Sequence, residues 1–277
     1  MDTETQPLII AFVSDLMMSE QIAATVRQMG YRLTVVDSPM AGRDTKVMGE
    51  PLYGPGAAIV EDLTRWHPAL LIFDVGSTVL PWEQWLPVIK SVPATRRLPA
   101  IAYGPHVEEA KLALAKECGA DVVVSRGKFL NSLPELIEKH AKVLDVAGLD
   151  ATCAEPLSAL ARQGIAEFNA GEYFEAHETL EHAWNEDQSL GRDLYRAILQ
   201  VAVAYLQIER GNYRGALKMF LRVRQWIDPL PAVCRGVDVG QLRADAAAVE
   251  AAVQALGPER IGEFDRGLFR GVRLVGE

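Results

Sequence analysis

Five short apolar runs alternate with segments of helical periodicity through the first half of the chain, and this alternation limits the fold more than any other feature. Each run is apolar on both faces and has the length of a buried strand. The runs are residues 8–13, 33–36, 70–73, 99–103 and 122–124, and the helical segments are residues 20–29, about 57–66, 82–92, 107–118 and 129–146. Five βα units of this kind predict a doubly wound, five-stranded parallel sheet.

The second half of the chain has helical periodicity only. The length of 277 residues indicates two domains. We expect an α/β domain over residues 1–147, a linker over 148–155, a helical domain over 156–256 and a C-terminal tail over 257–277. The expected helices are residues 156–170, 172–186, 192–210, 212–226 and 239–256. The third is apolar nearly all round and should be central, so this half predicts a compact, all-α bundle.

A short motif repeats in the helical half. Gly171, Tyr173 and Ala176 recur forty residues later as Gly211, Tyr213 and Ala216. A glycine in this position is typical of the end of one helix before the next begins, so each copy predicts a helical hairpin. Such hairpins are similar to tetratricopeptide-like packing, but two copies are too few for a solenoid.

The composition excludes several classes of protein. A formal charge of −9 argues against a nucleic-acid partner held by bulk electrostatics. Acidic Asp2 and Glu4 precede the first apolar run, where a signal peptide would be basic, and the third helix is too short and polar to span a membrane. We therefore expect a cytoplasmic protein with no membrane partner. The three cysteines are far apart and odd in number, which indicates reduced thiols rather than a disulfide.

The strand ends carry the candidate chemistry of the first domain, since ligands of such sheets lie at the carboxyl ends of the strands. Neither dinucleotide nor P-loop glycine motifs occur. The residues at these ends are Ser14, Asp15, Asp74, Gly104 and Arg126. An unusual Gly- and Pro-containing insertion, residues 37–56, follows the second strand, and we assign it no role.

About 140 residues, with the sequences LLIFDVGS, LPAIAYG and CGADVVVSRGKF, resemble the receiver domain of bacterial response regulators, a flavodoxin-like fold of phosphorelay signalling. In that family two acids after the first strand hold Mg²⁺, an aspartate accepts a phosphoryl group, and a hydroxyl residue and a lysine contact it. The resemblance implies that Asp74 is the phospho-acceptor and that Mg²⁺ binds at Asp15 and Asp74.

Three of the five positions depart from the receiver pattern. Ser14 replaces an acid, Gly104 replaces the hydroxyl residue and Arg126 replaces the lysine, unless Lys128 serves in a shifted register. Phosphoryl transfer needs a divalent cation and a fixed positive charge, so we expect a module that is deficient in phosphorylation. Asp74 has three interpretations: a phosphorylation site, an inherited but silent site, or a cap of the following turn.

A polar cluster is expected between the second and third helices of the helical domain. His177 lies on an otherwise apolar face, Glu181 lies four residues on at its edge, and Gln200 lies within the apolar third helix, whereas Glu178 is turned towards solvent. One hypothesis is a buried histidine hydrogen-bonded to Glu181 and Gln200. The others are a divalent metal held by His177 and Glu181, and an organic ligand pocket.

The same region resembles a catalogued family. The sequences GEYFEAHETLEHAW and AILQVAVAYLQIERGNYRGALKMF are similar to the domain of unknown function 309 over about residues 156–250. That resemblance implies a helical fold and no activity. The sequence therefore favours a non-enzymatic signalling or adaptor protein with a protein partner, through signalling or self-association. The alternative is a metal-dependent enzyme centred on His177 and Glu181.

Overall fold

The computed structural model describes residues 6–38 and 55–276, with side chains in the second range described from residue 59. The chain divides into two compact units, Met1–Leu144 and Asp145–Glu277, which are described separately. Most of the insertion at residues 37–56 lies outside the described residues. Within the described residues, no helix is both long and apolar enough to cross a membrane.

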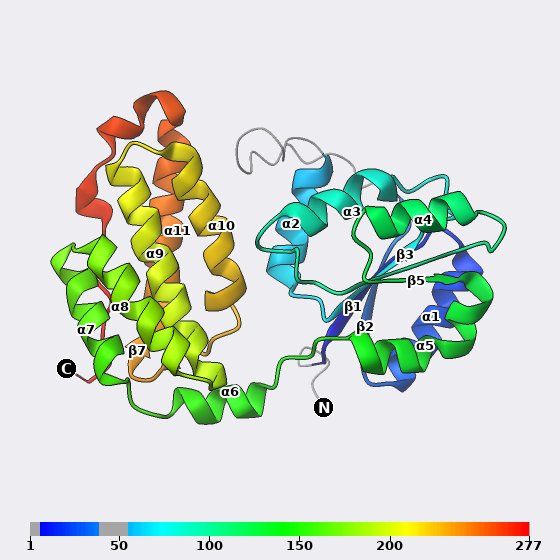
Figure 1. The fold of residues 1–277 in the computed structure, drawn as a ribbon, viewed down its shortest axis with the longest axis horizontal. Helices are drawn as coiled ribbons and strands as arrows, with labels where there is room; N and C mark the ends of the chain where they lie inside the picture. Colours follow the sequence, from blue (N-terminus) through cyan, green and yellow to red (C-terminus); the bar gives the residue numbers. More distant parts are fainter. Residues whose placement is uncertain (1–5, 39–54, 277) are drawn as a thin grey trace. The chain divides into compact units, whose positions relative to one another are not determined.

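The first unit contains the five-stranded parallel sheet that the sequence predicts (Figure 1). The strand order β2-β1-β3-β4-β5 is that of a flavodoxin-like doubly wound fold. Its strands are β1 (Leu8–Phe12), β2 (Arg32–Val36), β3 (Leu70–Asp74), β4 (Ala100–Gly104) and β5 (Val122–Ser125). The register places Phe12 beside Phe73 and Asp74 beside Tyr103. Polar residues that follow neighbouring strands therefore meet at one edge.

Helices cover both faces of the sheet, with α1 and α5 on one face and α2, α3 and α4 on the other (Figure 1). The helices are α1 (Leu16–Gln28), α2 (Pro55–Trp66), α3 (Trp82–Ser91), α4 (Glu109–Glu117) and α5 (Arg126–His140). On one face, Phe12 stacks on Phe73 and contacts Trp85 of α3. On the other, Tyr103 stacks on Phe129 of α5. Because β1, β3 and β4 are buried along their whole length, their sequences are continuously apolar.

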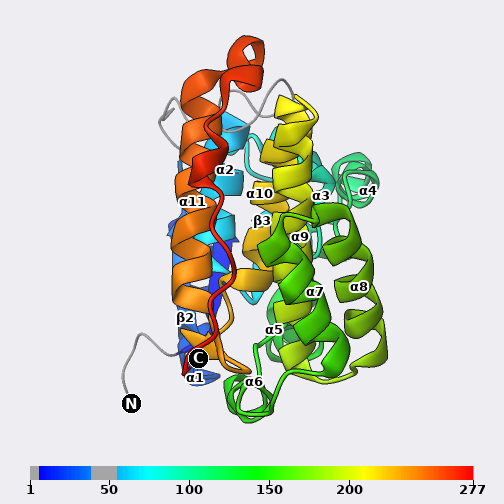
Figure 2. The same cartoon turned by 90° about the vertical axis from the view of Figure 1, so that its left-hand side faces the viewer.

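The second unit is the predicted helical bundle (Figure 2). Its helices are α6 (Val146–Cys153), α7 (Ala159–Ala170), α8 (Tyr173–Glu186), α9 (Asp193–Glu209), α10 (Tyr213–Ile227) and α11 (Val239–Leu256). Helix α9 is buried nearly all round, as its composition predicts. Two features were not expected: α6 occupies most of the expected linker, and a small antiparallel hairpin, β6 (Val233–Cys234) and β7 (Val237–Asp238), precedes α11.

The repeated glycines end helices. Gly171 follows α7 with φ 82°, and Gly211 lies just after α9 with φ 69°. This left-handed conformation carries no Cβ penalty in glycine, so each residue closes one helix as the next begins. The prediction of two helical hairpins is confirmed, because α7 packs against α8 and α9 against α10.

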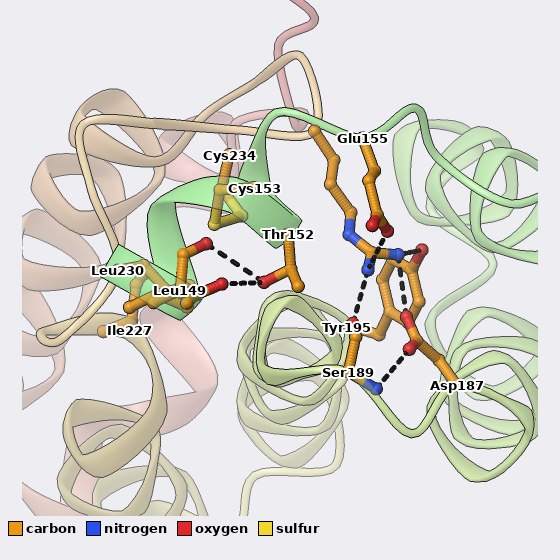
Figure 3. Close-up of a disulfide and its surroundings, with 12 residues drawn as sticks. Leu149, Thr152, Cys153, Glu155, Asp187, Ser189, Tyr195, Ile227, Leu230 and Cys234 are labelled. Carbon is orange, nitrogen blue, oxygen red and sulfur yellow. Dashed lines mark hydrogen bonds and ion pairs between the residues drawn. A yellow bond between two sulfur atoms is a disulfide. The ribbon is translucent and has the colours of Figure 1, made fainter. Parts of the chain in front are cut away.

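A disulfide joins Cys153 to Cys234, and the expectation of reduced thiols is wrong for these two residues (Figure 3). Cys153 is the last residue of α6 and Cys234 lies in β6, 81 residues later. Both are buried. Only the folded arrangement of the bundle brings them together, so their spacing in the sequence carries no sign of the pairing. Cys118 is a free thiol.

The residue after Cys234 secures the same junction. Arg235 has a nearly buried side chain that lies 2.7 Å from a carboxylate oxygen of Asp187 and donates a 2.7 Å hydrogen bond to Ser189 Oγ. It also bonds to the hydroxyl of Tyr195, and its backbone N–H donates to the Cys153 carbonyl at 2.6 Å. Figure 3 shows Asp187, Ser189 and Tyr195 close together, on the far side of Thr152 from the disulfide. The hairpin is thus held by covalent, ionic and hydrogen bonds together.

We predict that Cys234→Ser lowers the unfolding free energy of the helical domain by about 2–4 kcal/mol, because the disulfide closes a long loop in the unfolded chain. Chemical denaturation followed by circular dichroism measures the change. The matched control Cys118→Ser should change stability by no more than about 0.5 kcal/mol. Equal effects of the two substitutions would mean that the Cys153–Cys234 bond does not form.

Candidate functional site

The carboxyl edge of the sheet brings the predicted residues of the first domain together. Asp74 ends β3, Ser14 and Asp15 follow β1, Gly104 ends β4 and Arg126 begins α5 directly after β5. Asp74 is almost fully buried, whereas Asp15 and Arg126 are partly exposed. We call Asp15, Asp74 and Arg126 the edge site.

Arg126 lies between the two carboxylates. Its Nη2 is 3.4 Å from Asp74 Oδ2, and its Nη1 is 3.8 Å from Asp15 Oδ2. Lys128 is exposed, and among the described residues it is Arg126 that forms the ion pair with Asp74. Arg126 is therefore the fixed cation of this site. A guanidinium carries a permanent charge and five donors in a planar fork, which suits it to two acceptors at once.

The carboxylate oxygens of the edge site are also used within the fold. Asp74 Oδ1 accepts a 3.0 Å hydrogen bond from the Gly76 N–H, so Asp74 does cap the following turn. Asp15 caps α1 by accepting from the N–H groups of Met17 and Met18 at 2.9 and 3.1 Å. Capping and a role in the pocket are therefore combined in the same side chains.

The other two positions that depart from the receiver pattern, Ser14 and Gly104, make close contacts within the fold. Ser14 Oγ forms a 2.8 Å hydrogen bond with Ser77 Oγ. A Cβ at Gly104 would lie 3.0 Å from Val75 Cγ2, which is tighter than nearly all real contacts. A hydroxyl residue at position 104 would therefore require Val75 to move.

Burial sets the electrostatics of the edge site. It raises the pKa of Asp74, and the Gly76 N–H and the Arg126 charge oppose that rise. Tyr103 lies nearby with a buried hydroxyl that makes no hydrogen bond of normal geometry. Burial and the Asp74 charge raise the pKa of Tyr103 above its ordinary value. Sequence reasoning missed Tyr103 and Ser77, although each lies within a few residues of a strand end.

The polar cluster expected in the helical domain is not held together by hydrogen bonds among the described residues. Gln200 is buried, but its Oε1 has no hydrogen-bond partner. His177 is half-buried, whereas Glu178 and Glu181 are exposed. The buried face of α8 consists of Tyr173, Ala176, Leu180 and Ala183. Glu181 lies outside that face and is therefore exposed to solvent.

The metal hypothesis finds no support in this geometry. Across residues 6–38 and 55–276, the structure contains no group of three or more His, Cys, Asp or Glu side chains that could hold a metal ion. His177 and Glu181, like Asp15 and Asp74, therefore belong to no such group among the described residues. A lone histidine beside an exposed glutamate does not supply the ligand number of a zinc centre.

An arginine between two tryptophans links the same helices. The guanidinium of Arg196 on α9 lies 4.2 Å from the ring centre of Trp184 on α8 and 4.3 Å from that of Trp226 on α10. Cation–π contacts of this kind stabilise by about 0.5–2 kcal/mol each. The two tryptophans thus lie at the contacts between neighbouring helices, with the arginine of α9 between them.

Comparisons with known proteins match the two halves of the chain separately. Residues 161–219 match the family model described as a domain of unknown function, DUF309, within the region where the sequence resembles that family. No curated protein matches the chain.

Solved structures of receiver domains are similar to the first half. A candidate response regulator from Chloroflexus aurantiacus is 15% identical, with a TM-score of 0.39, over 48% of this chain and 96% of that one. The receiver domain of a sensor histidine kinase from Pseudomonas aeruginosa, with a magnesium ion in its active-site cleft, is 17% identical, with a TM-score of 0.38, over 49% of this chain and 97% of that one. A chemotaxis response regulator of Vibrio cholerae is 12% identical, with a TM-score of 0.37, over 49% and 98%. These identities and TM-scores describe similarity of fold and say nothing of the chemistry at the edge site.

We predict that ionisation of Asp74 lowers the unfolding free energy of the first domain as the pH rises. Because burial raises the pKa of Asp74 above its value in the unfolded chain, its stabilising contribution is complete at low pH and is lost as the pH rises through the folded pKa. Asp74→Asn should remove this loss, and Arg126→Met should enlarge it. Urea denaturation between about pH 4 and pH 7 measures it. The exposed control Glu20→Gln should follow the wild-type profile, and an Asp74→Asn profile parallel to wild type would contradict the prediction.

We predict that Gln200→Leu stabilises the helical domain by about 1 kcal/mol, because it removes a buried acceptor that has no donor. The matched control is Gln207→Leu on the same helix. Gln207 Oε1 accepts a 2.6 Å hydrogen bond from Asn212, so that substitution should cost about 0.5–1.5 kcal/mol. Thermal denaturation compares the two. A clear loss of stability in Gln200→Leu would show that the amide has a partner after all.

Proposed function

We propose that the chain is a non-enzymatic signalling or adaptor protein in which a receiver-like domain that is not phosphorylated is joined to a helical interaction domain. The observation that carries the proposal is the position of Arg126 between Asp15 and Asp74. A divalent cation that organised phosphoryl transfer would need these same two carboxylates, and it would meet a fixed positive charge beside them.

Three further features support the loss of phosphorylation. Asp74 is shielded from solvent, its side chain being only 3% exposed. Ser14 supplies a hydroxyl, already bonded to Ser77, where a receiver has a metal-binding carboxylate. Gly104 has no hydroxyl that could contact a phosphoryl group on Asp74, and Val75 packs closely against Gly104. In this proposal the first domain acts as a fixed protein-binding module, and Mg²⁺ has no required role.

We predict that the wild-type protein gains no stable phosphoryl group when it is incubated with acetyl phosphate and Mg²⁺. Intact-mass measurement is the readout. The double substitution Ser14→Asp with Arg126→Lys restores the missing acid and the compact ammonium charge, and it should permit partial modification. Adding Asp74→Asn to that variant should abolish the modification, which makes Asp74 its own control.

The contrary outcome is equally specific. If a large fraction of the wild-type chain gains one phosphoryl group, and Asp74→Asn alone removes it, then Arg126 does not block the site and the receiver-like domain is a working switch. The proposal would then be wrong for this domain, whatever the helical domain does.

A further inference from the structure

The last residues of the chain lie on the helical domain as a 3₁₀ turn, Arg266–Leu268, followed by a stretch without helix. Figure 2 shows this segment, drawn in red, returning along the bundle after α11. We call residues 264–275 the tail segment. Most of its side chains are exposed, and the buried ones are Phe264 and Val272. Its contacts with the bundle resemble those of a bound peptide rather than those of a core element.

An aromatic anchor begins the contact. Phe269 stacks on Tyr205 of α9, with ring centres 4.2 Å apart and an interplanar angle of 11°, and it meets Tyr173 of α8 edge-on at 5.7 Å. Phe168 of α7 packs against both tyrosines. Three helices thus build one aromatic cluster, Phe168, Tyr173 and Tyr205, that receives a single ring of the tail segment.

An asparagine side chain then binds the backbone of the tail segment. Asn169, at the end of α7, donates from Nδ2 to the Val272 carbonyl at 3.0 Å and accepts at Oδ1 from the Val272 N–H at 2.7 Å. A Cβ at Gly271 would lie 2.8 Å from Asn169 Oδ1, so a larger residue before Val272 would displace the Asn169 side chain from its two hydrogen bonds to the Val272 backbone. The site therefore selects an aromatic residue, any residue, a glycine and a small branched residue in succession.

Strand pairing completes the contact. The Asp238 N–H donates to the Arg273 carbonyl at 3.0 Å, and the Val275 N–H donates to the Gly236 carbonyl at 2.7 Å. Val237 and Leu274 form an antiparallel bridge. The tail segment thus pairs with β7 through an isolated antiparallel bridge, which is a short form of the β-augmentation by which many domains bind extended peptides.

The charges point to a basic occupant. The tail segment carries Arg266, Arg270 and Arg273 against the single acid Asp265. Arg266 lies 3.5 Å from Glu209 at the end of α9. The chain as a whole carries a formal charge of −9, so a basic segment is attracted to it at long range.

We propose that the surface formed by Phe168, Asn169, Tyr173, Tyr205 and β7 is a binding site for an extended, basic segment of a partner protein, and that the tail segment occupies this site in the unbound state. The segment carries an aromatic residue, any residue, glycine and a β-branched residue. The inference rests on the proposed function in that it gives the helical interaction domain its surface and the class of its partner.

The test uses the full-length chain and a fluorescein-labelled synthetic peptide of residues 263–276, with binding followed by fluorescence anisotropy. An attached segment competes at an effective concentration on the order of 1 mM, so the peptide should bind the wild-type chain weakly. Phe269→Ala weakens the attached competitor and should tighten peptide binding at least tenfold. The double variant Phe269→Ala with Asn169→Ala should bind the peptide at least tenfold more weakly than Phe269→Ala alone.

Matched controls separate the site from general effects of substitution. Phe174→Ala removes an exposed aromatic residue of α8 and should leave peptide binding as in the wild type. A peptide with valine in place of Gly271 should not bind, because its side chain would meet Asn169. Equal binding of this peptide and the native one, or equal binding to wild type and Phe269→Ala, would overturn the proposal.

Hydrogen exchange on the wild-type chain provides a test that does not depend on the folding of any variant. The amides of Val272 and Val275 should exchange more slowly than those of an unstructured chain but faster than those of α9, and excess unlabelled peptide should accelerate them. If they exchange only with global unfolding, the tail segment is a permanent part of the core and the proposal fails.

A second copy of the chain is the competing occupant of this surface. A wild-type dimer that the peptide dissociates would show that the tail of the second copy fills the site, which would overturn the assignment to a partner protein. A monomeric wild-type chain supports that assignment. None of these measurements involves Asp74 or Arg126. Failure of the tail proposal is therefore distinguishable from failure of the proposal that the receiver-like domain is not phosphorylated.

Discussion

Burial of the parallel sheet on both faces is the constraint on which the first domain depends. Strands β1, β3 and β4 have no side chain in water, so a polar group has no place within them until each strand ends. Asp74 is the last residue of its strand and is still almost fully buried. A carboxylate in that position requires nearby donors, and the Gly76 N–H and Arg126 provide them. The edge site is therefore a consequence of how the sheet is packed.

The helical domain has a comparable constraint in α9. This helix is surrounded by neighbours along most of its length, so the few polar side chains that it carries must be matched by the elements around it. Tyr195 meets Arg235, and Arg196 lies between two tryptophan rings. Gln200 Oε1 and the Tyr205 hydroxyl are exceptions, since both are buried without a hydrogen bond of normal geometry. Polar contacts made by α9 therefore link α8, α10 and the β6–β7 hairpin to one central element.

The fold was predictable where the sequence pattern itself is set by burial. Apolar runs marked the buried strands β1, β3 and β4 and also the partly buried edge strands β2 and β5, and the all-round apolar character of residues 192–210 marked α9 as central. The glycines at 171 and 211 marked the hairpins because glycine adopts the left-handed conformation of a helix end without a Cβ penalty. The candidate residues of the edge site were predictable for a topological reason: parallel strands end at the same edge.

The remaining features depend on contacts between distant residues, and single-sequence patterns do not carry them. Cys153 and Cys234 pair only because α6 and β6 are neighbours in the folded bundle. Helix α6 has the composition of a linker, because its Gly148, Asp150 and Thr152 are typical of loops. Asn169 forms hydrogen bonds with the backbone of Val272, 103 residues away. Such bonds do not depend on the side chain of Val272, so the sequence gives no sign of them. The expected link from His177 to Glu181 failed because helical spacing indicates that two side chains can meet, not that they are buried.

The disulfide also has a mechanical consequence. Tension that enters the helical domain from its N-terminal side passes through α6, reaches Cys153 and continues through the sulfur–sulfur bond to Cys234. The residues between the two cysteines, 154–233, include all of α7, α8, α9 and α10, and they carry none of that force. At roughly 3.4 Å per residue, the bond withholds roughly 270 Å of contour length from a stretched chain. The four helices that build the two hairpins are thus a shielded unit under load.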